Sequence, residues 1–273
     1  MNKIVRILFL LGLGFLVICF LSVNTVMSVV PKGANYTEVK TENAPWHNPQ
    51  DHDAYAGNVT ELDITGYTIT QNWQGYYGNV SGTIYLADAS DNVLYNWSLA
   101  SPEGEVYAAN ESSVTWTNIQ CFNFTATGTY ADDSSQRGAT SFYGMNLSQL
   151  ENSTDIEWDD VDGVNETFSL AGTHESGDGL THDLFYTNNL EFNAGECLST
   201  HLFNHSGSGA DSQFQEVLLY DPDNQVVVFT SILDEEDVSG FDNEYHDFEM
   251  LVLDDGHGTD LDPTIYYFYV ELE

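Results

Sequence analysis

Short stretches in which apolar and polar residues alternate recur from residue 58 to the C-terminus of this chain. In residues 79–86, for example, Val80, Ile84 and Leu86 fall on one face of an extended strand. Turn-forming residues separate these stretches, and no repeat of 20–50 residues is visible. The pattern predicts an all-β fold, specifically an antiparallel β-sandwich.

Several segments carry this signal most clearly. Residues 216–220 and 225–231 flank an Asp-Pro-Asp-Asn turn and predict a β-hairpin. Residues 79–86 and 93–99 predict a second hairpin, with its apolar face half-buried in an antiparallel sheet. Residues 61–65 alternate in the same way and are also predicted to be extended.

The chain is extremely acidic: 43 acidic residues stand against 5 basic ones, for a formal charge of −38 in 273 residues. Nucleic-acid binding is excluded, because neutralising phosphate requires clustered Lys and Arg. The content of 42% hydrophobic and 13% aromatic residues is enough for a folded core. The excess of acidic residues is compatible with three kinds of surface. The surface stays hydrated in high salt, it binds divalent cations, or it is an ordinary solvated acidic surface.

The amino terminus carries an export signal. Lys3 and Arg6 precede an unbroken apolar run over residues 7–23. The run fits a cleaved signal, with a cleavage site at residues 26–28, and it also fits an uncleaved membrane anchor. We therefore expect an extracellular, cell-surface location, with membrane contact through this N-terminal segment only.

Three regions follow from these patterns. Residues 1–28 are predicted to be the signal peptide or signal anchor. Residues 29–57 are predicted to be a linker or stalk. They show neither the two-residue period of a strand nor the 3.6-residue period of a helix, and they are rich in Pro, Asn and His. Residues 58–273 are predicted to form the extracellular β-sandwich domain, as one composite domain or as two stacked sandwiches.

The predicted export of the chain determines the expected state of its cysteines. Cys19 lies in the apolar run, which leaves Cys121 and Cys197 as a pair in an oxidising compartment. An even pair in an exported chain predicts a disulfide, and two separate buried thiols are the alternative.

Acceptor sites for N-linked glycans are frequent. Ten Asn-x-Ser/Thr triplets occur, none with proline in the middle position. Modified positions must face solvent. The predicted acceptors are Asn35, Asn58, Asn79, Asn96, Asn110, Asn123, Asn146, Asn152, Asn165 and Asn204.

Two acidic loops are candidates for calcium, the one cofactor that the sequence suggests, because calcium prefers several oxygen ligands. Polar turns without metal are the favoured interpretation of both loops. The candidate ligands are Asp159, Asp160 and Asp162 in one loop and Asp254, Asp255, Asp260 and Asp262 in the other.

Aromatic residues in the segment NWQGYYGN are candidates for stacking on sugars. These are Trp73, Tyr76 and Tyr77. Core filling or packing between strands is the commoner use of such side chains and is the favoured interpretation.

Three segments carry a resemblance: residues 57–108, DDVDGVNETF at residues 159–168, and the ending HDFEMLVLDDGHGTD…YYFYVELE. In these segments the chain resembles a family of uncharacterised exported cell-surface proteins of archaea. The resemblance covers nearly the whole exported region. It implies a β-rich cell-surface protein, and it supplies no activity and no catalytic residues.

These observations predict a glycosylated structural or adhesive protein of the cell surface, without catalytic activity. Its expected partners are the cell envelope or other surface proteins, together with N-linked glycans. A carbohydrate-binding surface module is the first alternative and a secreted hydrolase the second. Paired carboxylates carry no information here, because a chain with 43 acidic residues contains many by chance.

Overall fold

The computed structural model describes residues 30–45, 47–99, 102–122, 162–168, 181–210, 213–233, 238–254 and 263–272. Within these ranges the protein is all-β, and every strand pair is antiparallel, as predicted. Helical structure in these ranges is limited to the single turn α3 (Val164–Thr167) and the 3-10 turn η1 (Trp116–Asn118).

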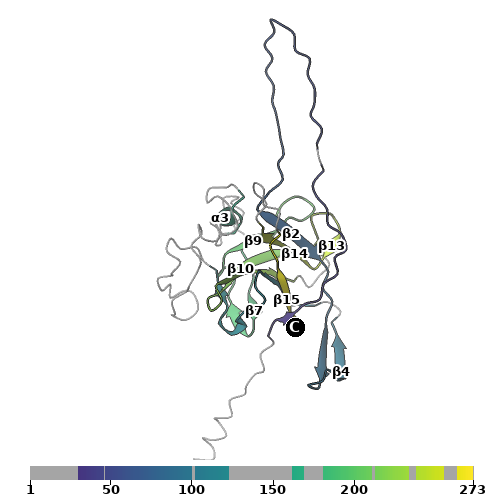
Figure 1. The fold of residues 1–273 in the computed structure, drawn as a ribbon, viewed down its shortest axis with the longest axis vertical. Coiled ribbons are helices and arrows are strands. Elements are labelled where there is room, and N and C mark those ends of the chain that lie inside the picture. Colours follow the sequence, from purple (N-terminus) through teal and green to yellow (C-terminus); the bar gives the residue numbers. More distant parts are fainter. Residues whose placement is uncertain are drawn as a thin grey trace, which may run out of the picture.

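One large sheet organises the body of the molecule (Figure 1). Its strand order is β1-β15-β5-β11-β10-β6, and β9 also pairs with β10. Strands from both ends of the chain therefore share this sheet. The bounds are β1 Lys32–Gly33, β5 Gly104–Ala109, β6 Gln120–Cys121, β9 Ser199–His201, β10 Gln215–Asp221, β11 Val226–Ile232 and β15 Tyr267–Leu272.

The hairpin β10–β11 forms the centre of the sheet and confirms the prediction for this segment. Its turn is organised by Asp221, which is fully buried. One carboxylate oxygen of Asp221 accepts the amide N–H of Asp223 at 3.0 Å, and the other accepts the N–H of Thr115 at 2.7 Å. Gln225 closes the turn with a φ of 59°. This is the Asx-turn chemistry expected of an Asp-Pro-Asp-Asn sequence.

Both faces of the sheet are covered. On one face lies the antiparallel pair β2 (Trp73–Gly78) and β14 (Phe248–Leu253), which packs against β10 and β11. On the other face lie η1 and the pair β7 (Phe185–Thr187) and β8 (Leu190–Phe192). This layering is consistent with a β-sandwich. It also explains why nearly every residue of β10 and β11 is buried, because both faces of each strand are covered.

Alternate residues of the sheet contribute to two separate cores. Phe229 and Leu218 belong to the core beneath β2 and β14, where they pack with Met250. Val228 and Leu219 belong to the core on the opposite face. Each fully buried side chain of this size stabilises the fold by about 1.5–3 kcal/mol relative to exposure.

Two further strand pairs lie outside the large sheet. The pair β12 (Val238–Ser239) and β13 (Tyr245–His246) is short. The hairpin β3 (Thr83–Ala87) and β4 (Val93–Ser98) confirms the predicted hairpin and projects from the body (Figure 1).

A second projection, which we call the arm, consists of residues 42–45 and 47–69. It leaves the body at the opposite end from the hairpin β3–β4 (Figure 1). Each of these residues is exposed, and none belongs to a strand. The tip is a turn in which the N–H of Asn58 donates to the carbonyl of Tyr55 at 3.2 Å, and Gly57 supplies the positive φ of 90°. The extended conformation predicted for residues 61–65 lies in this arm.

The stretch predicted as a linker contributes to the fold. Lys32 and Gly33 pair with Val270 and Tyr269 at the edge of the large sheet. The sequence did not reveal this strand, because two residues are too few to show an alternation of apolar and polar side chains. In the part of the chain that the structure describes, no helix is long and apolar enough to cross a bilayer, and residues 7–23 lie outside that part.

Candidate functional site

The predicted calcium loops fall mostly outside the described residues, which include only Asp162 and Asp254. The carboxylate of Asp162 accepts the hydroxyl of Thr70 at 2.5 Å and the side-chain amide of Asn72 at 3.0 Å. That of Asp254 accepts the N–H of Thr264 at 3.1 Å. Both carboxylates thus accept hydrogen bonds from groups of the protein itself. Among the described residues there is no group of three or more His, Cys, Asp or Glu that could hold a metal ion.

The three candidate stacking aromatics are half-buried and pack within the fold. The Trp73 ring contacts Phe168 and Phe229, and its indole N–H donates to the carbonyl of Asp162 at 2.6 Å. Tyr76 packs edge-on against Phe268, with ring centroids 5.1 Å apart. Their placement follows the alternative favoured from sequence, which is packing between strands.

Tyr77, the third candidate, also packs inside the fold. Its ring meets Phe241 edge-on at 5.0 Å and lies 4.8 Å from the ring of His246. The ammonium of Lys40 lies 5.9 Å from the centroid of the Tyr77 ring. None of these contacts leaves an open aromatic platform.

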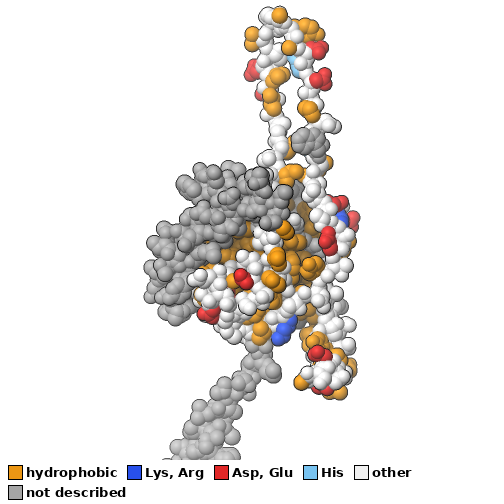
Figure 2. All heavy atoms as spheres, viewed as in Figure 1, with side chains coloured by type: hydrophobic (Ala, Val, Ile, Leu, Met, Phe, Trp, Pro, Cys, Tyr) orange, Lys and Arg blue, Asp and Glu red, His pale blue; other side chains and the backbone are white. Residues whose placement is uncertain are grey.

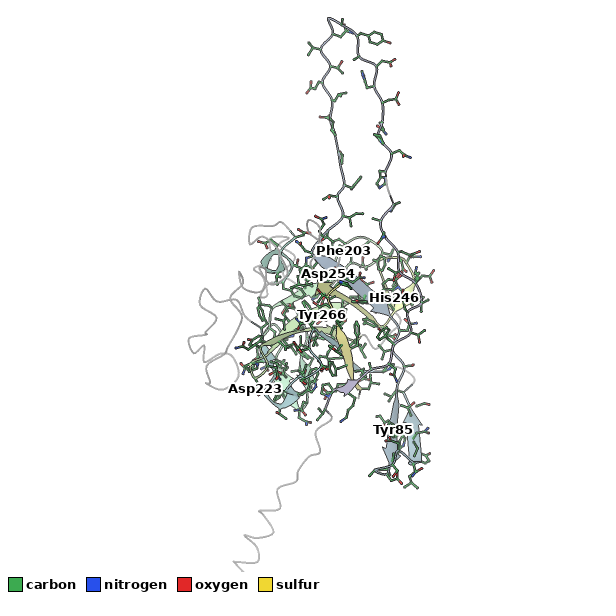
Figure 3. All side chains as sticks on the ribbon, viewed as in Figure 1. Tyr85, Phe203, Asp223, His246, Asp254 and Tyr266 are labelled. Carbon is green, nitrogen blue, oxygen red and sulfur yellow. A yellow bond between two sulfur atoms is a disulfide. The ribbon has the colours of Figure 1, made fainter. Side chains whose placement is uncertain are left out.

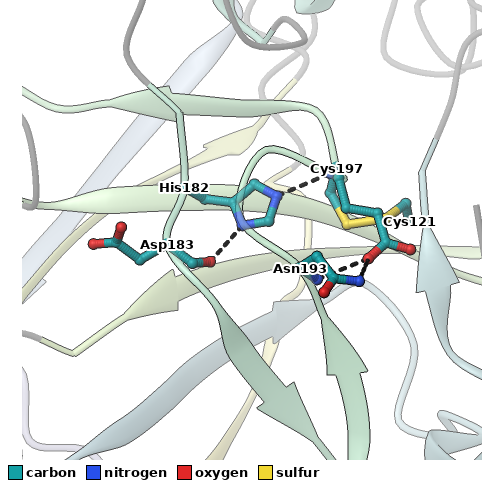
Figure 4. The surroundings of a disulfide bond; sticks show 6 residues. Cys121, His182, Asp183, Asn193 and Cys197 are labelled. Atoms are coloured by element: carbon teal, nitrogen blue, oxygen red, sulfur yellow. Dashed lines mark hydrogen bonds between the residues drawn. A yellow bond between two sulfur atoms is a disulfide. The ribbon is translucent and has the colours of Figure 1, made fainter.

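Cys121 and Cys197 form the predicted disulfide, which connects β6 to the loop before β9 (Figure 4). Both residues are buried. His182 supports this region, because its Nε2 accepts the backbone N–H of Cys197 at 2.8 Å and its Nδ1 lies 2.7 Å from the carbonyl of Asp183. Nδ1 must donate to a carbonyl while Nε2 accepts, so the ring is neutral. Burial lowers the pKa of His182 and favours the same form.

The described glycan acceptors lie where modification is sterically possible. Five of them are exposed, and Asn204 is half-buried with its side-chain oxygen accepting the N–H of Ser206 at 2.9 Å. Asn165 belongs to α3, and Asn123, Asn146 and Asn152 lie outside the described residues. The five exposed acceptors are Asn35, Asn58, Asn79, Asn96 and Asn110.

A pair of buried carboxyls is the feature most like an acid–base site. Glu105 on β5 and Glu271 on β15 are direct cross-strand partners, and their exposures are 4% and 2%. The hydroxyl oxygen of Tyr107 lies 3.2 Å from a carboxyl oxygen of Glu105 and 3.3 Å from one of Glu271. The N–H of Asn188 donates to Glu271 at 3.0 Å, and the Thr187 hydroxyl lies 3.1 Å from that of Tyr107.

This pair is enclosed by the fold. Burial, together with the neighbouring charges of Glu105 and Glu271, raises the pKa of Tyr107 well above its usual value of 10.0, so the phenol remains a hydroxyl donor. Tyr107 itself is fully buried. A substrate cannot reach carboxyls at this depth in the conformation described. The arrangement links β5, β15 and β7 through the hydroxyl of Tyr107.

Two further buried carboxyls lie on the opposite face of the sheet. Glu216 is fully buried, and one of its carboxyl oxygens accepts the N–H of Leu251 at 2.8 Å on the edge of β14. Burial raises the pKa of Glu216 well above its usual value. Burial also raises the pKa of Glu249 to about 7, although its carboxylate accepts the N–H of Phe241 at 3.0 Å.

The largest departure from the sequence-based expectations concerns the hairpin β3–β4. Its register places Ile84 opposite Trp97 and Leu86 opposite Tyr95, so these four side chains share one face. The predicted half-burial of this face is wrong. The exposures of these four residues range from 44% to 61%. The hairpin is a separate two-stranded sheet in the described part of the chain, with no second layer over it.

The opposite face of the hairpin differs in chemistry. Tyr85 lies opposite Asn96, which is a predicted glycan acceptor, and Thr83 lies opposite Ser98. Figure 3 shows Tyr85 on this projection, away from the body. One face of the hairpin is therefore apolar. The opposite face is mixed, because it carries Thr83, Asn96 and Ser98 together with Tyr85 and with Leu94, which is 79% exposed.

The base of the hairpin is fixed to the body. The N–H of Leu99 donates to the carbonyl of Gly82 at 3.3 Å. A Cβ atom at Gly82 would collide with the side chain of Leu272 on β15. This close approach places the base of the hairpin beside β15 of the large sheet.

Sequence reasoning missed the buried carboxyls and the exposure of the hairpin. The acidic residues gave no signal, because Glu105 and Glu271 are two of 43 acids. The hairpin did carry a signal: its alternation showed an apolar face, but not what covers that face. Comparison of the chain with protein-family models, with curated proteins and with solved structures finds no match.

Proposed function

We propose that this chain is an exported, glycosylated protein of the cell surface with a structural or adhesive role and no catalytic activity. We propose further that the apolar face of hairpin β3–β4 is the surface through which it binds another surface protein. The observation that carries this proposal is the exposure of Ile84, Leu86, Tyr95 and Trp97 on one face of a projecting hairpin.

An isolated two-stranded hairpin is at best marginally stable in water, and a hydrophobic face needs a covering layer. Burial of Trp97 alone would contribute about 1.5–3 kcal/mol. Figure 2 shows hydrophobic side chains gathered on this projection. An exposed apolar face on a soluble part of a protein is typical of an interaction site.

The predicted glycan acceptor on the opposite face supports binding through the face of Trp97. A glycan on Asn96 would extend from the face opposite Trp97 and would leave the apolar face free to bind. The rings of Tyr95 and Trp97 meet at an interplanar angle of 62°, which is an edge-on packing and not a flat platform for a sugar. This geometry favours a protein partner over a carbohydrate.

The proposal is tested by extracting the full chain from native cells in a mild non-ionic detergent and measuring its sedimentation. We expect the wild-type chain to sediment in complexes larger than one chain, and the variant Leu86→Ser/Trp97→Ser to sediment as single chains. The matched control is Tyr85→Ser, on the opposite face. Large complexes that persist in Leu86→Ser/Trp97→Ser, or a wild-type chain that sediments alone, would contradict the proposed role of this face.

A further inference from the structure

The arm and the hairpin β3–β4 are two uncovered segments of the same chain. Large apolar side chains of the arm are exposed by 57–100%, and those of the hairpin by 44–79%. Figure 2 shows hydrophobic side chains along both projections. In the arm they are Tyr55, Val59, Leu62, Ile64, Tyr67 and Ile69.

The arm contains a segment with the pattern of a strand. Over residues 61–65, Leu62 and Ile64 alternate with Glu61 and Asp63. A segment of this pattern in an extended chain presents an apolar side and an acidic side. Its five residues match the length of β3 (Thr83–Ala87).

The hairpin can accept such a segment. β3 and β4 pair only with each other among the described strands, so each has an edge whose backbone groups are not used in a ladder. An extended segment adds to such an edge through main-chain hydrogen bonds, while its side chains give specificity. A third strand would bring the hairpin to the size at which a small sheet becomes stable.

The arm and the hairpin project from opposite ends of the body (Figure 1), so an arm does not meet its own hairpin. We propose that residues 61–65 of one copy add as a strand to a free edge of hairpin β3–β4 in a second copy. Leu62 and Ile64 then extend the apolar face formed by Leu86 and Trp97. This inference rests on the proposed function and identifies the partner as a second copy of the chain.

One contact of this kind covers both projections, whereas a contact between two hairpins would leave the arm exposed. The two surfaces differ, so the contact is head-to-tail, and each copy retains a free arm at one end and a free hairpin at the other. Contacts of this type form open chains of subunits unless the rotation closes a ring. An open chain suits a structural role at a cell surface.

Charge makes this contact dependent on salt. Glu61 and Asp63 of the arm and Asp88 and Asp91 of the hairpin turn all carry negative charge, within a chain of formal charge −38. Repulsion between copies is screened over about 10 Å at 0.1 M salt and about 3 Å at 1 M. Association between copies is therefore stronger at high ionic strength.

Disulfide cross-linking between full chains tests the contact. Two single variants, Leu62→Cys and Leu86→Cys, are made in a Cys19→Ser background, carry different tags, and are oxidised separately and as a mixture in 1 M NaCl. We expect a heterodimer band on non-reducing gels in the mixture only, with a yield at least tenfold above that of either variant alone. Ser98→Cys, on the opposite face of the hairpin, replaces Leu86→Cys in the control and gives no band.

Each other outcome has a definite meaning. Cross-linking of Leu86→Cys with itself would overturn the arm as the occupant and show a contact between two hairpins. An intramolecular link in the double variant Leu62→Cys/Leu86→Cys, without dimers, would overturn the contact between copies. If no link forms while wild-type complexes still depend on Trp97, this inference fails and the proposed function stands with a different partner. If those complexes are absent, both fail.

Discussion

Loss of the Cys121–Cys197 disulfide is expected to lower the free energy of unfolding by about 4 kcal/mol. The bond joins residues 76 positions apart, and closing a loop of this length lowers the conformational entropy of the unfolded chain. The double variant Cys121→Ala/Cys197→Ala removes the bond without placing a hydroxyl in the buried site. Urea unfolding of the full chain in detergent, followed by tryptophan fluorescence, measures the effect.

The control for this experiment is Cys19→Ala, which also removes a cysteine but lies in the apolar N-terminal run. It should unfold at the same urea concentration as the wild-type chain. Reduction of the wild-type chain should reproduce the double variant. If the double variant and Cys19→Ala have equal midpoints, the disulfide does not stabilise the fold.

A second large effect is expected from Glu216→Gln, measured as a function of pH. Burial holds the pKa of Glu216 well above the usual value of 4.5, so the folded chain keeps a proton that the unfolded chain releases. The stability associated with neutral Glu216 is complete below pH 4.5 and falls as pH rises towards the folded pKa. The slope in that range is about 1.4 kcal/mol per pH unit.

Glutamine has the size of neutral glutamic acid and cannot ionise, so Glu216→Gln should remove this slope and raise stability at neutral pH. Glu103→Gln, at an exposed position, changes the net charge equally and serves as the control. Denaturant unfolding from pH 4 to pH 8 measures both variants. Identical pH dependence in Glu216→Gln and Glu103→Gln would show that Glu216 is ionised in the folded chain.

The elements that sequence predicts well are those set by local chemistry. The hairpin β10–β11 follows from two apolar runs and an Asp-Pro-Asp-Asn turn, whose aspartate Asp221 organises the backbone as such turns require. The hairpin β3–β4 follows from alternation in the same way. The disulfide followed from the small number of cysteines, which left Cys121 a single partner outside the apolar N-terminal run.

Pairings between distant segments could not be predicted in this way. β2 pairs with β14, and β15 lies between β1 and β5, although nothing in their local patterns specifies these neighbours. Alternation shows that a strand has an apolar face, but the arrangement of other elements decides whether that face is covered. Ile84 and Val228 both lie in apolar stretches, yet Ile84 is 44% exposed and Val228 is fully buried.

From the sequence, the candidate binding face of hairpin β3–β4 could be recognised only as a set of apolar residues in alternating positions. Its significance comes from the projection of the hairpin and from the position of the predicted glycan acceptor Asn96 on the opposite face. The buried carboxyls illustrate the reverse case. Glu105 and Glu271 meet at Tyr107 through the β5–β15 pairing, which brings together residues far apart in the chain.

The central claim is that a partner covers the apolar face of hairpin β3–β4. Amide hydrogen exchange of the full chain, read by mass spectrometry for peptides within residues 83–98, tests it directly. We expect these amides to exchange at least tenfold more slowly in the complexes extracted from native cells than in the single chain, because covering the face suppresses opening of the hairpin. Equal exchange rates in the two states would contradict the claim.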